Sequence, residues 1–320
     1  MENTAREIVK RGGFRSVSTD EALAIAAQYS TEYTKERFSQ FETSRAQYLF
    51  ERNKQELFMI VRELCLEMQH SEFSPVAFEL GFGESKELPP IQIPGDNMMA
   101  QLIGVVDRVD SWISDDQNFF RVVDYKTGLK DFDYCDLFNG MGLQMLLYLF
   151  ALQQEGEALL GQSAAPAGVQ YFPARLPVIS VEGRLTDEEA QKAREDIWKR
   201  QGLLLNNDFV LDAMSDDETQ SRMPYKRKKD GTVSGNLASD SQFEILKKYI
   251  LKILGAMVDD ISSGCVSPNP YERGSKHSAC TFCPYGSVCH KYAVEGRRNY
   301  AAMSASKFWE EVEKEVGEHG

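Results

Sequence analysis

Three side chains, Asp107, Asp124 and Lys126, have the types and spacing that hydrolytic chemistry requires. Asp107 lies in a short run that is rich in β-branched residues, and Asp124 and Lys126 end a second such run that begins at Phe119. A polar, turn-like segment separates the two runs, so the sequence predicts a β-hairpin. Because Asp124 and Lys126 are two residues apart, they face the same side of their strand.

Carboxylates on such a hairpin need either a partner or solvent, because a buried unpaired charge costs several kcal/mol. Their neighbours are apolar: Val105, Val106, Val122 and Val123. One hypothesis is therefore a Mg²⁺ site for phosphodiester hydrolysis, with hard oxygen ligands from Asp107, Asp124 and the backbone carbonyl of Tyr125. Lys126 would polarise the attacking water or stabilise charge on the phosphate. The alternative is an edge hairpin that carries a solvated salt bridge.

Further polar residues stand on the elements expected around this hairpin. Gln144 and Tyr148 are four residues apart on an apolar helix, so they share one face and could reach the sheet end that carries Lys126. The alternative is a core helix with one polar pair. Glu79, in a strand beside the hairpin, is either a further carboxylate of the site or a structural acid.

Three cysteines, Cys280, Cys283 and Cys289, fall within ten residues. In a chain with no secretory signal, such spacing favours a metal over disulfides, and three soft ligands suit zinc or an iron–sulfur cluster. The alternative is unligated thiols. A fourth ligand is needed, and its candidates are Cys265, His277 and His290 nearby and Cys65 and Cys135 farther away.

A basic run, Lys226, Arg227, Lys228 and Lys229, precedes Asp230-Gly231. It is a candidate DNA contact, or else the solvated tip of a hairpin whose turn is Asp230-Gly231.

The whole chain has 320 residues and a net charge of −13, which excludes general adhesion to nucleic acid but not a nuclease with a basic channel. No apolar run approaches the roughly 20 residues of a membrane span, and the N-terminus is unlike a signal peptide. We therefore expect a cytoplasmic protein with no membrane association. No Gly-x4-Gly-Lys-Ser/Thr phosphate loop occurs, so ATP is not bound in that manner.

Periodicity predicts helices and strands in an order that suits a mixed α/β sheet, with a hairpin joined through a crossover helix to a further strand. We expect three segments: an N-terminal helical segment (1–74), a core (75–265), and a cysteine segment with a C-terminal helix (266–320). The predicted helices are 21–38, 44–70, 136–154, 186–200, 241–262 and 304–318, and the predicted strands besides the hairpin are 76–82 and 169–172. Residues 84–97, 164–167 and 213–240 are predicted to be a connection, a linker and a surface excursion.

Four motifs occur in one order: Gly104-x-x-Asp107-Arg108-x-Asp110, Asp124-Tyr125-Lys126-Thr127-Gly128, Gln144-x3-Tyr148 and the cysteine cluster. Together they resemble the RecB-like branch of the PD-(D/E)XK nucleases, and within it the C-terminal nuclease domain of the AddB family. Phe78–Gly83, Lys228–Gly231 and Cys280–Cys283 extend the resemblance over nearly the whole chain. It implies a restriction-endonuclease-like core, a mixed sheet flanked by helices, with extra helices and a C-terminal cysteine segment.

The resemblance also implies a function. It implies a Mg²⁺-dependent deoxyribonuclease, an exonuclease that cleaves single-stranded DNA in a helicase–nuclease complex with an AddA-like partner subunit, acting in double-strand break repair and recombination. Asp107 and Asp124 would be metal ligands, Lys126 the catalytic lysine, and Gln144 and Tyr148 the helix motif after the active site. The clustered cysteines would belong to a [4Fe–4S] cluster.

Two features of the family are missing: a fourth cluster cysteine far upstream, and a histidine in a Gly-x3-His motif. We therefore expect this chain to be a C-terminal part of a longer protein, with an incomplete metal site and with zinc or free thiols replacing the cluster. The alternative function is a catalytically incomplete, nuclease-like module for DNA binding or partner docking.

Overall fold

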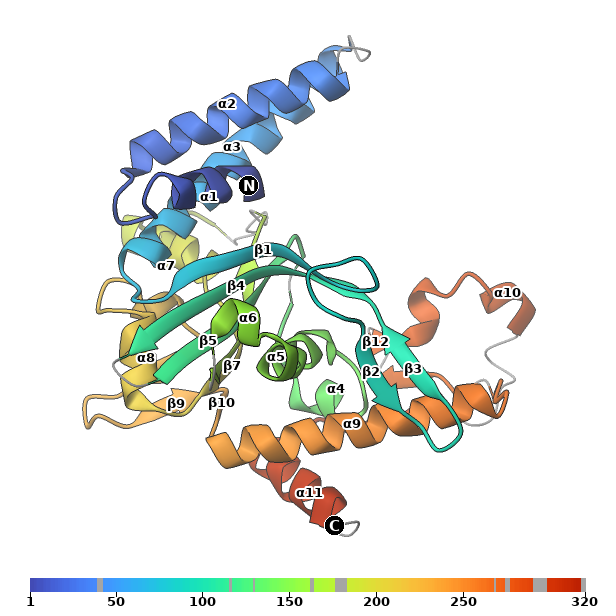
Figure 1. Cartoon of the computed structure of the whole chain (residues 1–320). Helices are drawn as coiled ribbons and strands as arrows, with labels where there is room; N and C mark the ends of the chain where they lie inside the picture. Colours follow the sequence, from blue (N-terminus) through green and yellow to red (C-terminus); the bar gives the residue numbers. More distant parts are fainter. Residues whose placement is uncertain are drawn as a thin grey trace. The chain divides into compact units, whose positions relative to one another are not determined.

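The structure, a computed structural model, describes residues 1–38, 43–114, 117–128, 130–161, 164–175, 183–267, 269–273, 277–289 and 298–317. A six-stranded mixed sheet is the centre of its first unit (Figure 1). In spatial order the strands are β1 (Ser74–Phe82), β4 (Gly104–Ser114), β5 (Gln117–Lys126), β6 (Ala165–Pro173), β7 (Gln201–Leu205) and β10 (Leu237–Ala238). The predicted hairpin is β4–β5, and it occupies interior positions of the sheet.

The strand directions explain the connections between them. β4 pairs antiparallel with β1 and β5, whereas β5 and β6 run parallel. Parallel neighbours need a crossover, and here the chain crosses through α5 (Gln144–Glu155) and α6 (Glu157–Leu160). The predicted mixed sheet with a crossover helix is thus confirmed.

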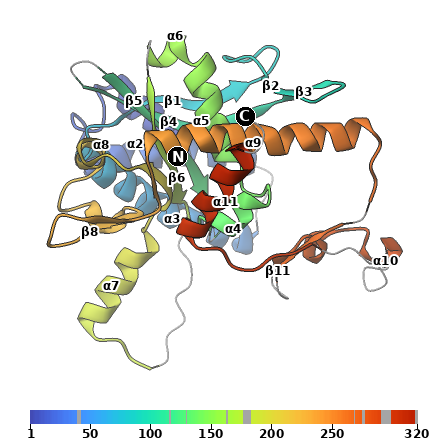
Figure 2. The ribbon, with the colours of Figure 1, turned by 90° about the horizontal axis from the view of Figure 1, so that it is seen from below.

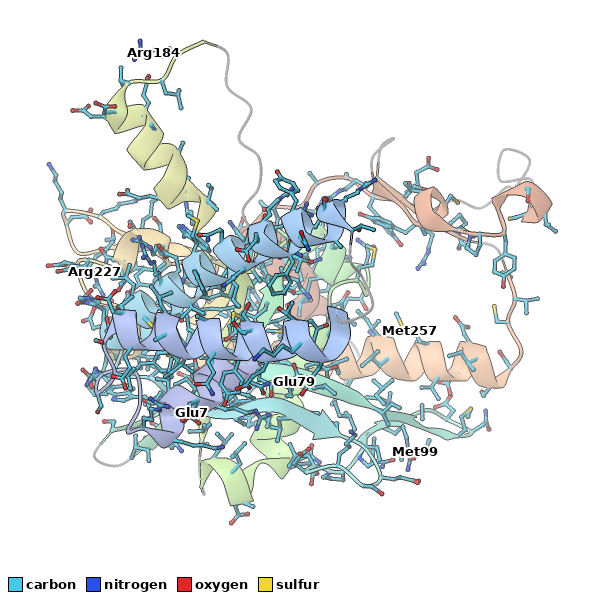
Figure 3. All side chains as sticks on the ribbon, turned by 90° about the horizontal axis from the view of Figure 1, so that it is seen from above. Glu7, Glu79, Met99, Arg184, Arg227 and Met257 are labelled. Carbon is cyan, nitrogen blue, oxygen red and sulfur yellow. The ribbon has the colours of Figure 1, made fainter. Side chains whose placement is uncertain are left out.

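Helices cover both faces of the sheet (Figures 1 and 3). On one face lie α1 (Glu2–Lys10), α2 (Thr19–Phe38) and α3 (Ser44–Gln69), and on the other lies α5. α3 corresponds to the predicted helix 44–70, and its apolar stripe is buried at Val61, Leu64 and Met68, which share a core with Val123 of β5 and Phe172 of β6. Burial of this stripe ties the N-terminal helices to the strands of the hairpin.

The rest of this unit consists of shorter elements. They are α7 (Asp187–Ile197), α8 (Asp208–Met214), a 3₁₀ turn (Gln220–Arg222) and the hairpin of β8 (Tyr225–Arg227) and β9 (Val233–Gly235). α7 lies within the predicted helix 186–200 and begins with a capping box, in which Thr186 and Glu189 exchange hydrogen bonds.

A second unit comprises residues 91–102, 133–143 and 242–320. It contains β2 (Ile91–Pro94) paired with β3 (Met99–Leu102), α4 (Tyr134–Phe138), most of α9 (Asp240–Ser262), β11 (Tyr271–Arg273), β12 (His277–Ser278), a 3₁₀ turn (Ala279–Phe282), α10 (Gly286–Cys289), β13 (Arg298–Asn299) and α11 (Ala305–Gly317). Figure 2 shows α9 as one unbroken helix. Aromatic rings of α4, α9 and α11 pack together, with Phe138 stacked on Tyr249 and in edge contact with Phe308.

Several sequence predictions of local structure were wrong. Residues 84–97 are not wholly a polar connection, because they include β2, and the predicted helix 136–154 is two helices. Gly140 and Gly142 lie between these helices with φ of 79° and 68°, a region that ends a helix. Residues 165–167 begin β6 instead of forming a linker, because Ala165 and Pro166 pair with Phe119 and Phe120 of β5 and the strand becomes buried from residue 166 on. The excursion 213–240 contains β8, β9 and β10, while α1 and β7 were not predicted.

The first unit joins residues 1–90, 103–132 and 144–241. Each compact unit is assembled from several separate stretches of the chain and does not correspond to one consecutive segment. The predicted segment boundaries at residues 74 and 265 therefore stay predictions. Across the described ranges, no helix combines the length and the apolar character that crossing a membrane requires.

Candidate active site

Acidic side chains line up across three neighbouring strands of the sheet. The flanking pairs of β1 and β4 set Glu79 across from Asp107, and those of β4 and β5 set Asp124 on the other side of Asp107. The row continues to β6, where Tyr171 pairs with Asp124. Residues across neighbouring strands have nearby Cβ atoms, and Asp107 lies close enough to Asp124 for the two charges to interact.

Asp107 is held by the backbone of the opposite strand. The last backbone pair of the hairpin at this end is Arg108 with Val123, and beyond it the amide of Tyr125 donates to Oδ2 of Asp107 at 2.8 Å. Burial raises the pKa of Asp107, the hydrogen bond from Tyr125 opposes this rise, and the negative charge of Asp124 adds to it. The fold therefore orients this carboxylate without neutralising it.

Asp124 is buried, with 9% of its surface exposed, and Lys126 Nζ lies 2.5 Å from its Oδ2. This contact is an ion pair by distance, yet among the described groups Oδ2 receives no hydrogen bond of good geometry. The ammonium of Lys126 also lies 5.7 Å from the centre of the Tyr171 ring. A solvated salt bridge on an edge strand is thus not the arrangement found, since both strands are interior and Asp124 is buried.

The donor set fits Mg²⁺. Two carboxylates lie side by side, one Asp124 oxygen lacks a hydrogen bond, and burial together with the charge of Asp124 raises the pKa of Asp107. Within the described ranges, no three His, Cys, Asp or Glu side chains gather closely enough to hold a metal. Mg²⁺ is commonly bound through one or two carboxylates, with waters and substrate phosphate completing its shell, so two carboxylates suffice.

Glu79 carries a strained backbone. Its φ is 51°, and among the described residues other than glycine it alone has a positive φ. Such a conformation costs about 1–3 kcal/mol and persists where the surrounding structure imposes it, often at functional sites. Burial and the charges of Glu2 and Asp107 raise the pKa of Glu79. Figure 3 marks this residue on β1. The sequence pattern contains no signal of this strain.

The predicted helix pair is brought together. Gln144 Nε2 donates to Tyr148 Oη at 3.1 Å, and the Tyr148 ring stacks on Phe82 at 5.7 Å between centroids. A Cβ added to Gly104 would lie only 2.1 Å from Tyr148 Oη, so this hydroxyl packs directly on the start of β4. In the described contacts Tyr148 therefore touches the strand of Asp107, whereas a contact with Lys126 is not seen.

The hairpin also carries charges in its buried interior that the sequence analysis missed. Glu67 of α3 accepts hydrogen bonds from Arg108 at 3.1 Å, Arg121 at 2.8 Å and Arg200 at 2.7 Å, and Asp110 accepts from Arg121 at 2.9 Å. All five side chains are almost fully buried. The available signal was the motif itself, in which Arg108 and Asp110 alternate with Asp107 along β4.

This buried cluster reaches the site through Tyr125. Arg108 Nη1 donates to Tyr125 Oη at 3.0 Å, while the Tyr125 amide donates to Asp107. One tyrosine thus joins the buried charges to the catalytic edge of the hairpin.

The three clustered cysteines lie on the second unit, with Cys280 in a 3₁₀ turn, Cys283 just after it and Cys289 at the end of α10. Cys283 and Cys289 are exposed, and the described structure does not gather the three thiols as a metal site. Among the candidate fourth ligands, Cys265 is exposed, Cys65 and Cys135 are buried in different units, and the side chains of His277 and His290 lie outside the described residues. The described residues thus place no fourth ligand beside the three thiols, and the presence of a cluster stays a prediction.

The basic run lies on the β8–β9 hairpin, where Lys226, Lys228 and Lys229 are exposed. Arg227, marked in Figure 3, instead pairs with Asp208 at 2.9 Å and with Asp212 at 2.6 Å. DNA contact by this run stays a prediction, with Arg227 already engaged by acids of α8.

A mixed sheet with opposed aspartates and a neighbouring lysine on its central hairpin defines a class of nuclease. Residues 6–290 match the sequence profile of the PD-(D/E)XK nuclease superfamily, and the chain belongs to this family.

Its relatives agree with this assignment. The chain is similar to the B subunit of the ATP-dependent helicase/deoxyribonuclease of Acetivibrio thermocellus, with 38% identity over 239 residues that cover 72% of this chain and 21% of the relative. Proteins of the same description in Desulforamulus reducens and Caldanaerobacter subterraneus subsp. tengcongensis are 34% and 33% identical, over 77% and 87% of this chain and 22% and 24% of those relatives. The resemblance to AddB is thus confirmed, and the chain spans less than a quarter of the length of these relatives.

Proposed function

We propose that this chain is the catalytic domain of a Mg²⁺-dependent deoxyribonuclease that cleaves single-stranded DNA as an exonuclease. The observation that supports it most is the opposition of Asp107 and Asp124 on interior strands, with a buried Asp124 oxygen that lacks a hydrogen bond and Lys126 beside it. Such a pair concentrates negative charge where a divalent cation and a phosphodiester would meet.

In this proposal Asp107, Asp124 and the carbonyl of Tyr125 hold the ion, which supplies Lewis-acid polarisation of a phosphate oxygen when bound. The Tyr125 amide fixes Asp107, so the ligand is oriented before any ion arrives. The ammonium of Lys126 lies where it can orient water or stabilise charge on the phosphate. Glu79, strained and next to Asp107 in the row, is a further carboxylate for the same site.

The wider setting rests on the relatives. Their names join a helicase to a deoxyribonuclease and describe them as the B component of that enzyme. We propose that this chain acts in the same kind of assembly, with an AddA-like partner subunit, on DNA under repair and recombination in the cytoplasm. The clustered cysteines would hold a [4Fe–4S] cluster there once a fourth ligand is supplied.

Cleavage of end-labelled single-stranded DNA in Mg²⁺ tests the proposal. The chain is assayed alone and with its partner subunit, as wild type, Asp124→Ala and Lys126→Ala. We expect each variant to lose about 10²-fold or more in rate, the usual scale for removing such a group. Exposed residues of the same charge, changed as Asp217→Ala and Lys35→Ala, serve as controls and should cut normally. If both site variants cut as fast as wild type, the site assignment is wrong.

A second candidate is a catalytically incomplete nuclease-like module for DNA binding or partner docking. The described residues favour it in one respect, since no three side-chain ligands, Glu79 included, gather closely enough among them to hold a metal. A Mn²⁺ soak separates the two functions. An ordered ion between Asp107 and Asp124 supports the enzyme, and an unoccupied pair at saturating Mn²⁺ supports the module.

A further inference from the structure

A pocket of about 410 Å³ opens beside Lys126 in the first unit. Ends of β5 and β6, the start of β7 and parts of α3 and α7 contribute to it. Its basic lining residues are Arg52, Lys126, Lys130, Arg175 and Lys199. Two acids, Asp131 and Asp196, also line it, so cations dominate a pocket in a chain whose net charge is −13.

A buried tyrosine gathers two of these cations. Tyr171 is 6% exposed, and the ammonium groups of Lys126 and Lys130 lie 5.7 and 6.0 Å from its ring centre. The face of an aromatic ring attracts cations, so Tyr171 helps to hold both ammonium groups at the pocket. Burial and the charge of Asp124 raise the pKa of Tyr171 to about 12, so its phenol stays neutral and supplies no counter-charge. An anion bound in the pocket would meet both ammonium groups, of which that of Lys126 is already paired with Asp124.

The other cations are available to a ligand. Within the described structure, no ion pair joins Lys130, Arg175 or Lys199 to a carboxylate, whereas Arg52 pairs with Glu56 at 3.5 Å. An excess of such cations in one concave site favours a polyanion over a small neutral molecule.

Part of the remaining lining is apolar. Pro173 and Ile197 form part of the wall, so the pocket offers a surface for a sugar or a base as well as cations for phosphate. Its volume falls in the range of about 300–1,000 Å³ that ligand pockets span, which suits a nucleotide unit. A base could enter from a duplex only after unpairing, which costs a few kcal/mol, so the pocket selects single strands.

We propose that this pocket binds the nucleotide of single-stranded DNA next to the phosphodiester at Asp107 and Asp124. Lys130, Arg175 and Lys199 contact its phosphates, and Pro173 and Ile197 contact its sugar or base. The assignment rests on the proposed function for the location of the cut bond. The pocket would then be a binding subsite for the DNA strand, and its size would explain why the enzyme prefers single-stranded DNA.

Fluorescence anisotropy of a labelled oligothymidine of about ten nucleotides, in EDTA so that no cleavage occurs, tests the subsite. We expect the double variant Lys130→Ala/Lys199→Ala to raise the Kd about tenfold or more and to reduce the slope of log K against log salt by about 1.4. The matched control Lys10→Ala/Lys35→Ala removes the same charge from exposed positions of α1 and α2 and should change the Kd less than about twofold. Equal losses in both double variants would overturn the proposal.

A blunt duplex of the same length provides a second arm. We expect it to bind more weakly than the single strand and to respond little to Lys130→Ala/Lys199→Ala. Duplex binding that is as tight and as sensitive to this variant would overturn the single-strand assignment.

The outcomes also separate the subsite from the proposed chemistry. If wild type never cleaves DNA but the pocket variant loses oligothymidine binding, the catalytic proposal fails and the subsite stands. If Asp124→Ala stops cleavage while the pocket variant binds like wild type, the subsite fails alone.

Discussion

The amide of Tyr125 donates to Oδ2 of Asp107 at 2.8 Å, one position beyond the last backbone pair of β4 and β5. A side chain thus replaces a strand carbonyl as the acceptor. The exchange fixes Asp107 at the point where the ladder of the hairpin ends, and it places the carboxylate beside Asp124. Because burial and Asp124 raise the pKa of Asp107, the arrangement favours function at a cost in stability.

Asp107→Asn should therefore stabilise the metal-free protein at neutral pH while it abolishes cleavage. The amide oxygen can still accept from Tyr125, and the unfavourable charge is removed. We expect a rise of a few degrees in Tm in EDTA, the scale that about 1 kcal/mol produces. Wild type takes up a proton at Asp107 as pH falls through its raised pKa, so the advantage of the variant should shrink in acid. Thermal unfolding measured at several pH values checks this, and a lower Tm for Asp107→Asn at neutral pH would refute it.

Wild type should also gain stability from Mg²⁺ or Mn²⁺, since a ligand that binds only the folded state raises Tm. Asp107→Asn should lose this gain. Asp217→Asn, an exposed change of the same type, is the control and should keep it. A metal-dependent shift of equal size in both variants would place the ion elsewhere.

Gly104→Ala should impair the site through Tyr148. The added Cβ would lie 2.1 Å from Tyr148 Oη and 2.9 Å from its Cζ, so the ring or the strand must move. We expect a loss of about 1–3 kcal/mol, the usual cost of overpacking, with slower cleavage. Tyr148→Phe in the same chain removes the closest atom and should restore part of the stability. Urea unfolding of the two single variants and the double variant measures this coupling, and strict additivity would contradict the contact.

Glu67→Gln should destabilise the protein strongly, by about 3–5 kcal/mol, because it leaves buried arginines without their partner. Burial alone would raise the pKa of Glu67, but Arg200, Arg121 and Arg108 lower it from 4.5 to about 2. A lowered pKa contributes stability that is complete above pH 4.5 and is lost as pH falls towards 2. The difference between wild type and variant should therefore shrink below pH 4.5.

The control for this change is Glu72→Gln. Glu72 forms an exposed pair with Arg15, and such pairs contribute about 1 kcal/mol at most. Urea midpoints at neutral and acid pH give the comparison. Similar losses for Glu67→Gln and Glu72→Gln would show that the buried cluster does not stabilise the fold.

The thiols of Cys280, Cys283 and Cys289 should be protected by iron. Anaerobic reconstitution with iron and sulfide should yield the absorbance of an iron–sulfur cluster and block their reaction with a thiol reagent. Cys265, which is exposed, reports on the fourth ligand, since it becomes protected only if it joins the cluster. Full reactivity of all four thiols and no retained iron would remove the cluster from this chain, and bound zinc would identify the alternative metal.

Local patterns were sufficient for the elements with strong signals. The stripe of α3, the capping box at Thr186 and the β-branched runs of the hairpin each encode their own structure, so those elements were predicted. Where the local signal was weak, the prediction was wrong. Ala165 and Ala167 were predicted to lie in a linker because small residues give little strand signal, and their strand is stabilised by neighbouring strands of the sheet. Gly140 and Gly142 split the helix predicted as one, through φ values that only the folded chain fixes.

The sequence by itself determined which charged side chains the hairpin brings together. Alternation places Asp124 and Lys126 on one side, and the spacing of Asp107 within its own run makes it their partner, because both follow from the period of a strand. The tertiary structure decided the rest. Strand order places the hairpin in the interior, which buries Asp124 and raises the pKa of Asp107, and the approach of α3 brings Glu67 to Arg108 and Arg121. These are effects of burial and of contacts between distant segments, and the period of a single segment does not contain them.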